Sequence, residues 1–170
     1  MVASKIFQFD NLAENLTGFT RHLLDDLTAL LMPYHHESNL LFKVKIIIIE
    51  LLNNAVKHSG SNQTHLELHL DATALVITKT DTGEPFKLLN ELKDNDTVMI
   101  RSDAMHVLYA TKAGPVIHFT FEENLAEEVD VNQLSEHLGL LMIAKAANEF
   151  TYQYQQLENV FKVKLYLSGY

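Results

Sequence analysis

The chain has 170 residues, of which 47% are hydrophobic and 21% charged, so it is long enough for one domain with a sizeable core and too short for two. Its 22 acidic and 13 basic residues give a formal charge of -9, which argues against non-specific nucleic-acid binding, because such binding depends on neutralised phosphates. The absence of cysteine excludes disulfides, thiolate metal sites and cysteine nucleophiles. No signal-peptide run and no long uncharged apolar stretch occurs, which predicts a cytoplasmic protein without a membrane partner.

A first helix is predicted after a short edge strand at residues 5–9. Asp10 is a candidate N-cap, and Pro33 follows the last apolar position. A stripe of this kind most often packs on the core, and the alternative is the seam of a homodimer. Its apolar residues recur at steps of three and four: Leu12, Leu16, Phe19, Leu23, Leu27 and Leu30.

Two histidines, His35 and His36, follow in the next loop beside Glu37. Histidine pairs can bind metals, but no third ligand accompanies this pair in the sequence. Solvated loop histidines are therefore the simpler interpretation.

The central stretch, residues 46–58, reads IIIIELLNNAVKH and is predicted to form a buried helix. The helix is predicted to begin near Ser38, and the pair Ser59 and Gly60 is typical of a C-cap. It is apolar around most of its circumference, through Leu40, Leu41, Val44, Ile46, Ile47, Ile48, Ile49, Leu51, Leu52 and Ala55.

One polar line runs along this helix. At 100° per residue, Glu50, Asn54 and Lys57 fall within about 60° of one another, and Lys43 continues the line two turns earlier. A carboxylate, an amide and an ammonium on a buried helix are costly to desolvate unless they pair with one another, a metal or a ligand. The line therefore predicts a site, and the alternative is a simple ion pair between Glu50 and Lys57.

Two strands and an acidic turn follow the central helix. Residues 64–70 alternate strictly, with leucines predicted to face inward. Residues 75–80 read as the next antiparallel strand, which leads into DTGEPF at residues 81–86, where glycine and proline keep the backbone irregular. A short helix is predicted at residues 88–92.

The second half of the chain reads as hairpin, helix and hairpin, which gives about three helices and about five to seven strands in all. The sequence therefore predicts one α+β domain over residues 1–170: a two-layer sandwich in which a mixed, mostly antiparallel sheet is covered on one face by helices. The later elements are two β-type runs at 105–110 and 116–121, a helix at 134–149, and strands at 150–154 and 160–167 joined by a turn at 157–159.

Two motifs, ELLNNAVKH at residues 50–58 and DTGEPF at residues 81–86, carry a resemblance to a known superfamily. The first is similar to the N-box of the GHKL, or Bergerat-fold, ATPases, which include histidine kinase catalytic domains, anti-sigma factor serine kinases and the ATPase subunit of DNA gyrase. The second is similar to the D-x-G-x-G/P box of that superfamily. The order of elements also matches over most of the chain, and the closest similarity is to stand-alone anti-sigma-type ATPases.

The resemblance implies ATP or ADP and Mg²⁺ as ligands, and it implies roles for four residues of the polar helix. Asn54 would coordinate the Mg²⁺ that bridges the phosphates, because its amide oxygen suits that cation. Glu50 matches a carboxylate that acts as a general base in some branches. Lys57 and His58 would lie toward the phosphates, where a cation offsets their charge.

On the base side, the resemblance implies roles for the DTGEPF turn. Asp81 would accept a hydrogen bond from the adenine amino group, and Gly83 would let the backbone approach the ring. The pattern of residues alone is consistent with such a site, because a polar line on a buried helix and an acidic loop at a strand end can converge on one cavity. The alternative is that the Asp-Thr-Gly sequence is an ordinary turn.

Two features depart from the family pattern. The second glycine box, which brings backbone amides to the phosphates, is represented by HLGL, so Gly139 is retained and His137 replaces a glycine. The family lid is glycine-rich, whereas the lid or hairpin insertion here, residues 87–133, contains the single glycine Gly114. Either the predicted hairpin forms a rigid cover over a bound nucleotide, or it fills the pocket.

Two functions from different classes remain open. The first is an Mg-ATP-binding regulatory enzyme in signal transduction, either a serine protein kinase or a weak ATPase acting on a protein partner. The second is a catalytically degenerate interaction module that binds its partner through the hairpin or the leucine-striped first helix. The presence of Glu50, Asn54 and Asp81 favours retained nucleotide binding, and the missing glycines favour lost or altered turnover.

Overall fold

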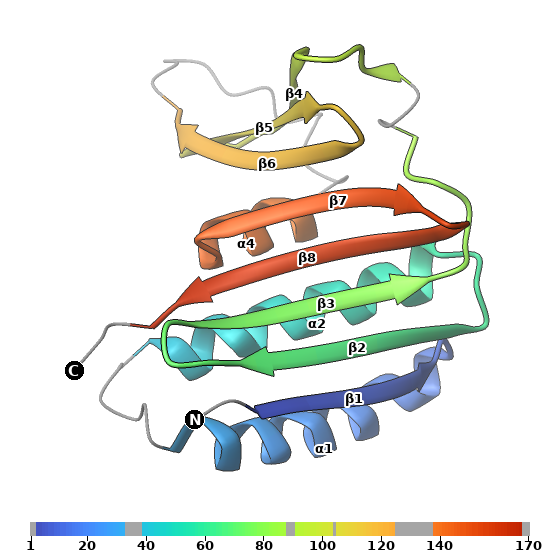
Figure 1. Ribbon diagram of the computed structural model, residues 1–170, viewed down its shortest axis with the longest axis vertical. Coiled ribbons are helices and arrows are strands. Elements are labelled where there is room, and N and C mark those ends of the chain that lie inside the picture. The colour runs from blue at the N-terminus through green and yellow to red at the C-terminus, as the bar shows by residue number, and fades with distance from the viewer. Residues whose placement is uncertain (1–2, 33–38, 88–90, 104, 125–137, 168–170) are drawn as a thin grey trace.

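The computed structural model describes residues 3–32, 39–87, 91–103, 105–124 and 138–167. In these ranges the chain forms one eight-stranded sheet with three helices on one of its faces (Figure 1). The helices are α1 (Ala13–Leu31), α2 (Leu40–His58) and α4 (Leu138–Ala146). The strands are β1 (Ala3–Asp10), β2 (Gln63–Leu70), β3 (Ala74–Asp81), β4 (Thr97–Ser102), β5 (His106–Ala113), β6 (Val116–Glu123), β7 (Glu149–Gln155) and β8 (Glu158–Tyr166).

The strand order is β1-β2-β3-β8-β7-β6-β5-β4, and each neighbouring pair is antiparallel. The predicted two-layer α+β fold is therefore confirmed, with an antiparallel sheet in place of a mixed one. The described residues contain one strand more than predicted, because β4 was missed. Its register shifts between Met99 and Arg101, and a bulge of this kind breaks the period-two pattern that reveals a strand.

The first helix follows its predicted stripe but not its predicted cap. Leu23 and Leu27 are fully buried, as the stripe requires. Asp10 does not cap the helix, because pairing of β1 with β2 continues to this residue and its carboxylate accepts a hydrogen bond from Gln63 Nε2 at 3.0 Å. The N-cap is Leu12, which has no capping side-chain bond and is 53% exposed.

The C-terminal end of α2 is as predicted. Ser59 is the C-cap, and Gly60 follows with a φ of +65°, which favours glycine. Complete burial was wrong for the first turn, where Leu41 and Phe42 are 42% and 65% exposed. The predicted start near Ser38 lies outside the described residues. Within the described ranges, no helix combines the length and the apolar character that crossing a membrane requires.

The last helix and hairpin differ from the prediction at two boundaries. The predicted helix at 134–149 ends at Ala146, and Glu149 already belongs to β7, while residues 134–137 lie outside the described ranges. The turn between β7 and β8 consists of Gln156 and Leu157, both with positive φ, in place of residues 157–159. A two-residue turn of this kind matches the twist of the strands, and it places Asn159 inside β8.

The predicted hairpin at residues 105–121 is confirmed as β5 and β6, which turn at Gly114 and Pro115. β6 then pairs with β7 through three residues, Val116 to His118, so the β4–β6 meander continues the sheet (Figure 1). The short helix predicted at 88–92 falls mostly on residues outside the described ranges.

Candidate functional site

Four predicted site residues lie on α2, and the structure divides them into two pairs. Glu50 and Asn54 are half-buried and lie one turn apart. Lys57 and His58 are exposed in the last turn of the helix. The middle of the polar line is thus enclosed by neighbouring elements, and its end faces solvent.

The first described turn of α4 lies directly against this middle section. A Cβ added to Gly139 would be 2.7 Å from Glu50 Oε2 and 3.5 Å from Asn54 Oδ1. Cβ atoms essentially never approach other atoms as closely as the first of these distances, so any larger residue here requires the carboxylate to move. Residues from two distant motifs therefore meet between α2 and α4.

The environment of Glu50 favours its protonated form. Burial raises the pKa of Glu50 above its ordinary value of 4.5, and the charge of Lys57 opposes that rise. No ion pair joins Glu50 to Lys57 within the described ranges, so Lys57 acts on the carboxylate through space. The simple ion pair considered from the sequence is not formed.

Asp81 ends β3 on the helix-covered face of the sheet and is 2% exposed. Its Oδ2 forms an ion pair with Lys79 Nζ. Its Oδ1 accepts hydrogen bonds from the backbone N–H of Gly83 at 3.0 Å and from Asn159 Nδ2 at 2.9 Å. Because a carboxylate offers about four acceptor positions, the described partners leave about one of them open.

Asn159 of β8 also holds the loop that follows β3. Its Nδ2 donates to the backbone oxygens of Gly83 at 3.0 Å and of Glu84 at 3.1 Å. Its Oδ1 accepts a hydrogen bond from Tyr152 Oη of β7 at 2.7 Å, and that hydroxyl oxygen in turn accepts from the Phe86 N–H at 2.8 Å. The loop conformation therefore depends on side chains from β7 and β8.

Gly83 brings the same loop into contact with the end of α2. A Cβ added to Gly83 would be 1.4 Å from the backbone oxygen of Ser59, so no other residue fits without moving the backbone. Ser59 is itself buried, and its hydroxyl donates to the backbone oxygen of Ala55 at 2.8 Å. The aspartate loop and the C-terminal turn of α2 are thus in close contact.

The structure gathers the predicted site residues into two groups along α2. Gly139 meets the middle of the helix at Glu50 and Asn54, and Gly83 meets its end at Ser59. At 1.5 Å per residue these points lie about 8 to 14 Å apart along the helix axis. An extended ligand with one polar end and one flat end can bridge such a span.

Three polar residues of the site were missed from the sequence: Lys79, Tyr152 and Asn159. The signal for Lys79 was present, because the alternation of β3 places it on the same face as Ile77 and Asp81. No signal indicated Asn159, because the misplaced turn put it outside a strand. Its pairing with Asp81 is a product of the β3–β8 register.

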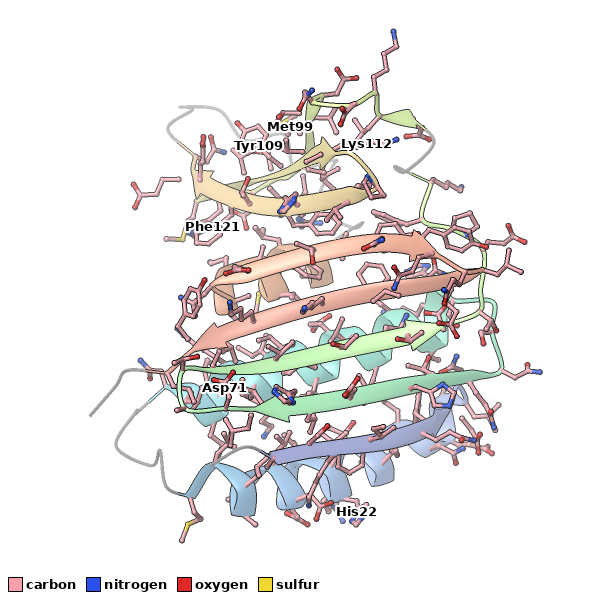
Figure 2. All side chains as sticks on the ribbon, in the orientation of Figure 1. His22, Asp71, Met99, Tyr109, Lys112 and Phe121 are labelled. Carbon is pink, nitrogen blue, oxygen red and sulfur yellow. The ribbon has the colours of Figure 1, made fainter. Side chains whose placement is uncertain are left out.

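An aromatic cluster joins the aspartate motif to the hairpin. The ring of Phe86 packs against Tyr152, Phe119 and Phe161, with centroid distances of 5.6, 6.2 and 6.3 Å. Tyr109 lies on the other face of β5, because the residues on either side of it are fully buried in the core (Figure 2). The hairpin therefore touches the aspartate motif through Phe119 and not through Tyr109.

The oxygen atoms of Glu50 and Asn54 are of the kind that Mg²⁺ prefers. This cation is usually held by one or two protein ligands together with phosphates and waters. The described ranges contain no cluster of three His, Asp or Glu side chains able to hold a metal alone. His35, His36 and His137 lie outside the described residues.

A search of protein-family models and of curated proteins finds no match to this chain. What the protein does must therefore be inferred from the geometry of these residues and from the resemblance of the two motifs.

Proposed function

We propose that the protein binds ATP or ADP with Mg²⁺ between α2, α4 and the loop after β3, and that it is a cytoplasmic regulatory protein of the histidine kinase-like ATPase type. In this proposal it acts on a protein partner in signal transduction, as a serine protein kinase or a weak ATPase of the anti-sigma type. The similarity of residues 50–58 and 81–86 to the two boxes of the GHKL superfamily supports the assignment.

The contact of Gly139 with Glu50 and Asn54 is the observation that carries this proposal. These residues come from two motifs that the resemblance assigns to one phosphate site, and they lie against each other in the fold. An alanine in place of Gly139 would displace the carboxylate of Glu50 from its observed position. A glycine whose Cβ would collide with a carboxylate fits a site where backbone must approach a ligand.

The phosphate side of the site has a defined division of roles in this proposal. The amide oxygen of Asn54 would hold Mg²⁺, which supplies positive charge to the phosphate oxygens. Glu50 would accept the proton of an attacking hydroxyl or water, and burial, which raises its pKa, makes its carboxylate a stronger base than an exposed one. Lys57 and His58, at the exposed end of α2, would offset phosphate charge.

The base side follows from the loop after β3. The remaining acceptor position of Asp81 would receive the adenine amino group, because a carboxylate accepts and does not donate. Gly83 would allow the ring to approach the backbone. The hydrogen bonds from Asn159 hold both residues in place.

One observation favours the second candidate, a catalytically degenerate interaction module. Asp81 is 2% exposed and already has three partners, and the hairpin residue Phe119 packs against Phe86 next to it. In that case Lys79 occupies the place of a ligand amino group. The meander formed by β4, β5 and β6 would then be the partner-binding surface.

Thermal unfolding with and without Mg-ATP or Mg-ADP distinguishes the two candidates. A ligand at about 100 times its Kd stabilises the native state by about 2.7 kcal/mol, which raises Tm by about 5 °C or more for a chain of this size. We expect this shift in the wild type and its loss in Asn54→Ala.

Asn53→Ala is the matched control, because it removes the same amide from the neighbouring position of the same helix, about 100° away from Asn54. It should keep the full shift. A wild type whose Tm does not respond to nucleotide, with or without Mg²⁺, contradicts the first candidate and supports the interaction module. Equal loss of the shift in both variants contradicts the role of Asn54.

A further inference from the structure

Lys79 is the least expected side chain of the core. It is 3% exposed, and the two inward positions that precede it on the strand, Leu75 and Ile77, are fully buried apolar residues. Its Nζ is paired with Asp81 and lies 5.1 Å from the centre of the Phe161 ring. Lysine is almost never buried to this extent without a partner, so the ion pair accounts for how it is accommodated.

The ion pair does not by itself account for why a lysine is present. Burial lowers the pKa of Lys79, and the adjacent Asp81 opposes that change. Replacing a buried ion pair by apolar residues of similar volume is often neutral or stabilising, whereas removing one partner leaves a costly unpaired charge. If the protein requires a buried carboxylate at Asp81, that carboxylate in turn requires a cation beside it, and this explains why a lysine is present at position 79.

We propose that Lys79 is a positioning residue for nucleobase recognition, whose ammonium group supplies the internal counter-charge that lets Asp81 serve as a buried and oriented carboxylate acceptor. This inference rests on the proposed function. The ion pair holds Oδ2, while Gly83 and Asn159 hold Oδ1, so the carboxylate has one orientation and about one open acceptor position.

The other groups around Asp81 cannot replace this charge. Thr64 of β2 and Asn159 of β8 face Asp81 in the sheet register, and both are neutral. At the end of α2, Gly83 meets the backbone of Ser59, which is also neutral. Tyr152 of β7, whose hydroxyl donates to Asn159, is also titratable, but burial raises its pKa to about 12, so it stays protonated through the neutral range.

The test is the pH profile of ADP binding, measured by calorimetry between about pH 5.5 and about pH 8.5. Lys79→Met and Lys79→Gln both remove the charge, and glutamine keeps a hydrogen-bond donor in case methionine prevents folding. Without a counter-charge, a buried carboxylate takes up a proton more readily as the pH falls, and a protonated acid is a weaker acceptor for the base. We expect the affinity of both variants, relative to wild type, to fall by about tenfold toward low pH.

Lys79→Arg keeps the charge and should follow the wild-type profile, as should Lys162→Met, which removes an exposed lysine of β8. Expressing each affinity relative to wild type cancels the titration of the ADP phosphates. Profiles of Lys79→Met and Lys79→Gln that run parallel to wild type overturn the role of Lys79, even where ADP binds. A wild type that does not bind ADP overturns the proposed function as well.

Discussion

Glu50 shows how a single side chain can serve either packing or chemistry. It is half-buried on α2, its carboxylate lies against the backbone of Gly139, and burial raises its pKa above 4.5. A carboxyl group in this state binds a proton more tightly in the folded chain than in the unfolded one. It therefore contributes stability at acid pH that is lost as the pH rises from 4.5 through the folded-state pKa.

Glu50→Gln tests this linkage. Glutamine does not titrate, so the stability of the variant relative to wild type should increase as the pH rises above 4.5 and should be constant below that value. Urea unfolding at a series of pH values measures the difference. Glu67→Gln, on the exposed face of β2, is the control and should show no such trend.

The same variant tests the proposed role of Glu50 as the general base. In that role, Glu50→Gln keeps ADP binding and loses turnover, and a variant that retains wild-type turnover contradicts it.

At the scale of elements, two glycines mark the contacts that assemble the site. Gly139 joins α4 to α2, where an added Cβ would meet the end of the flexible Glu50 side chain. Gly83 joins the loop after β3 to α2, where an added Cβ would meet the backbone oxygen of Ser59 at 1.4 Å. A side-chain end can move aside, whereas a helix terminus cannot move without disturbing its hydrogen bonds.

Alanine should therefore affect the stability of the fold differently at these two glycines. Gly139→Ala should change stability by less than about 1 kcal/mol, because the gain in helix propensity offsets the displacement of Glu50. It should nevertheless weaken Mg-ADP binding by about tenfold or more, because the displaced side chains belong to the proposed phosphate site. Gly83→Ala should lose about 3 kcal/mol or more, seen as a Tm lower by about 6 °C or more. Unchanged Mg-ADP affinity in Gly139→Ala would show that its close contact is structural.

At the scale of the whole molecule, the sheet is unevenly joined. The pairs β2–β3, β5–β6 and β7–β8 are matched along nearly their full lengths, whereas β6 meets β7 through three residue pairs. The β4–β6 meander is thus attached to the rest of the sheet by a short ladder and by the aromatic contacts of Phe119 with Phe86 and Phe150. It also packs against α4, where Lys145 Nζ lies 3.2 Å from His106 Nδ1. Units held by few contacts open independently of the global unfolding reaction.

Hydrogen exchange of the native protein should resolve this difference. Amides of the β5–β6 hairpin should exchange through an opening that costs less free energy than exposure of the central strands β3 and β8. Exchange measured at increasing urea concentration separates the two reactions. Equal protection of both regions would indicate that the meander and the central sheet unfold as one cooperative unit.

The sequence by itself determined the elements whose residues repeat with a clear period. The alternation of β2 and β3, the polar line and C-cap of α2, and the β5–β6 hairpin are all local patterns, because a strand or helix repeats every two or every 3.6 residues. The candidate positions Glu50, Asn54 and Asp81 could be singled out because charged and amide groups are costly in apolar surroundings.

Only the tertiary structure decided which of these residues meet. Periodicity states which face a side chain occupies, but register and turn geometry determine its neighbour on the next strand. The two-residue turn at Gln156 and Leu157 places Asn159 opposite Asp81, whose carboxylate already pairs with Lys79 on the same face of β3. The amide that orients the proposed base site therefore arises from a pairing between strands, which no local pattern records, whereas the ion pair follows the alternation of a single strand.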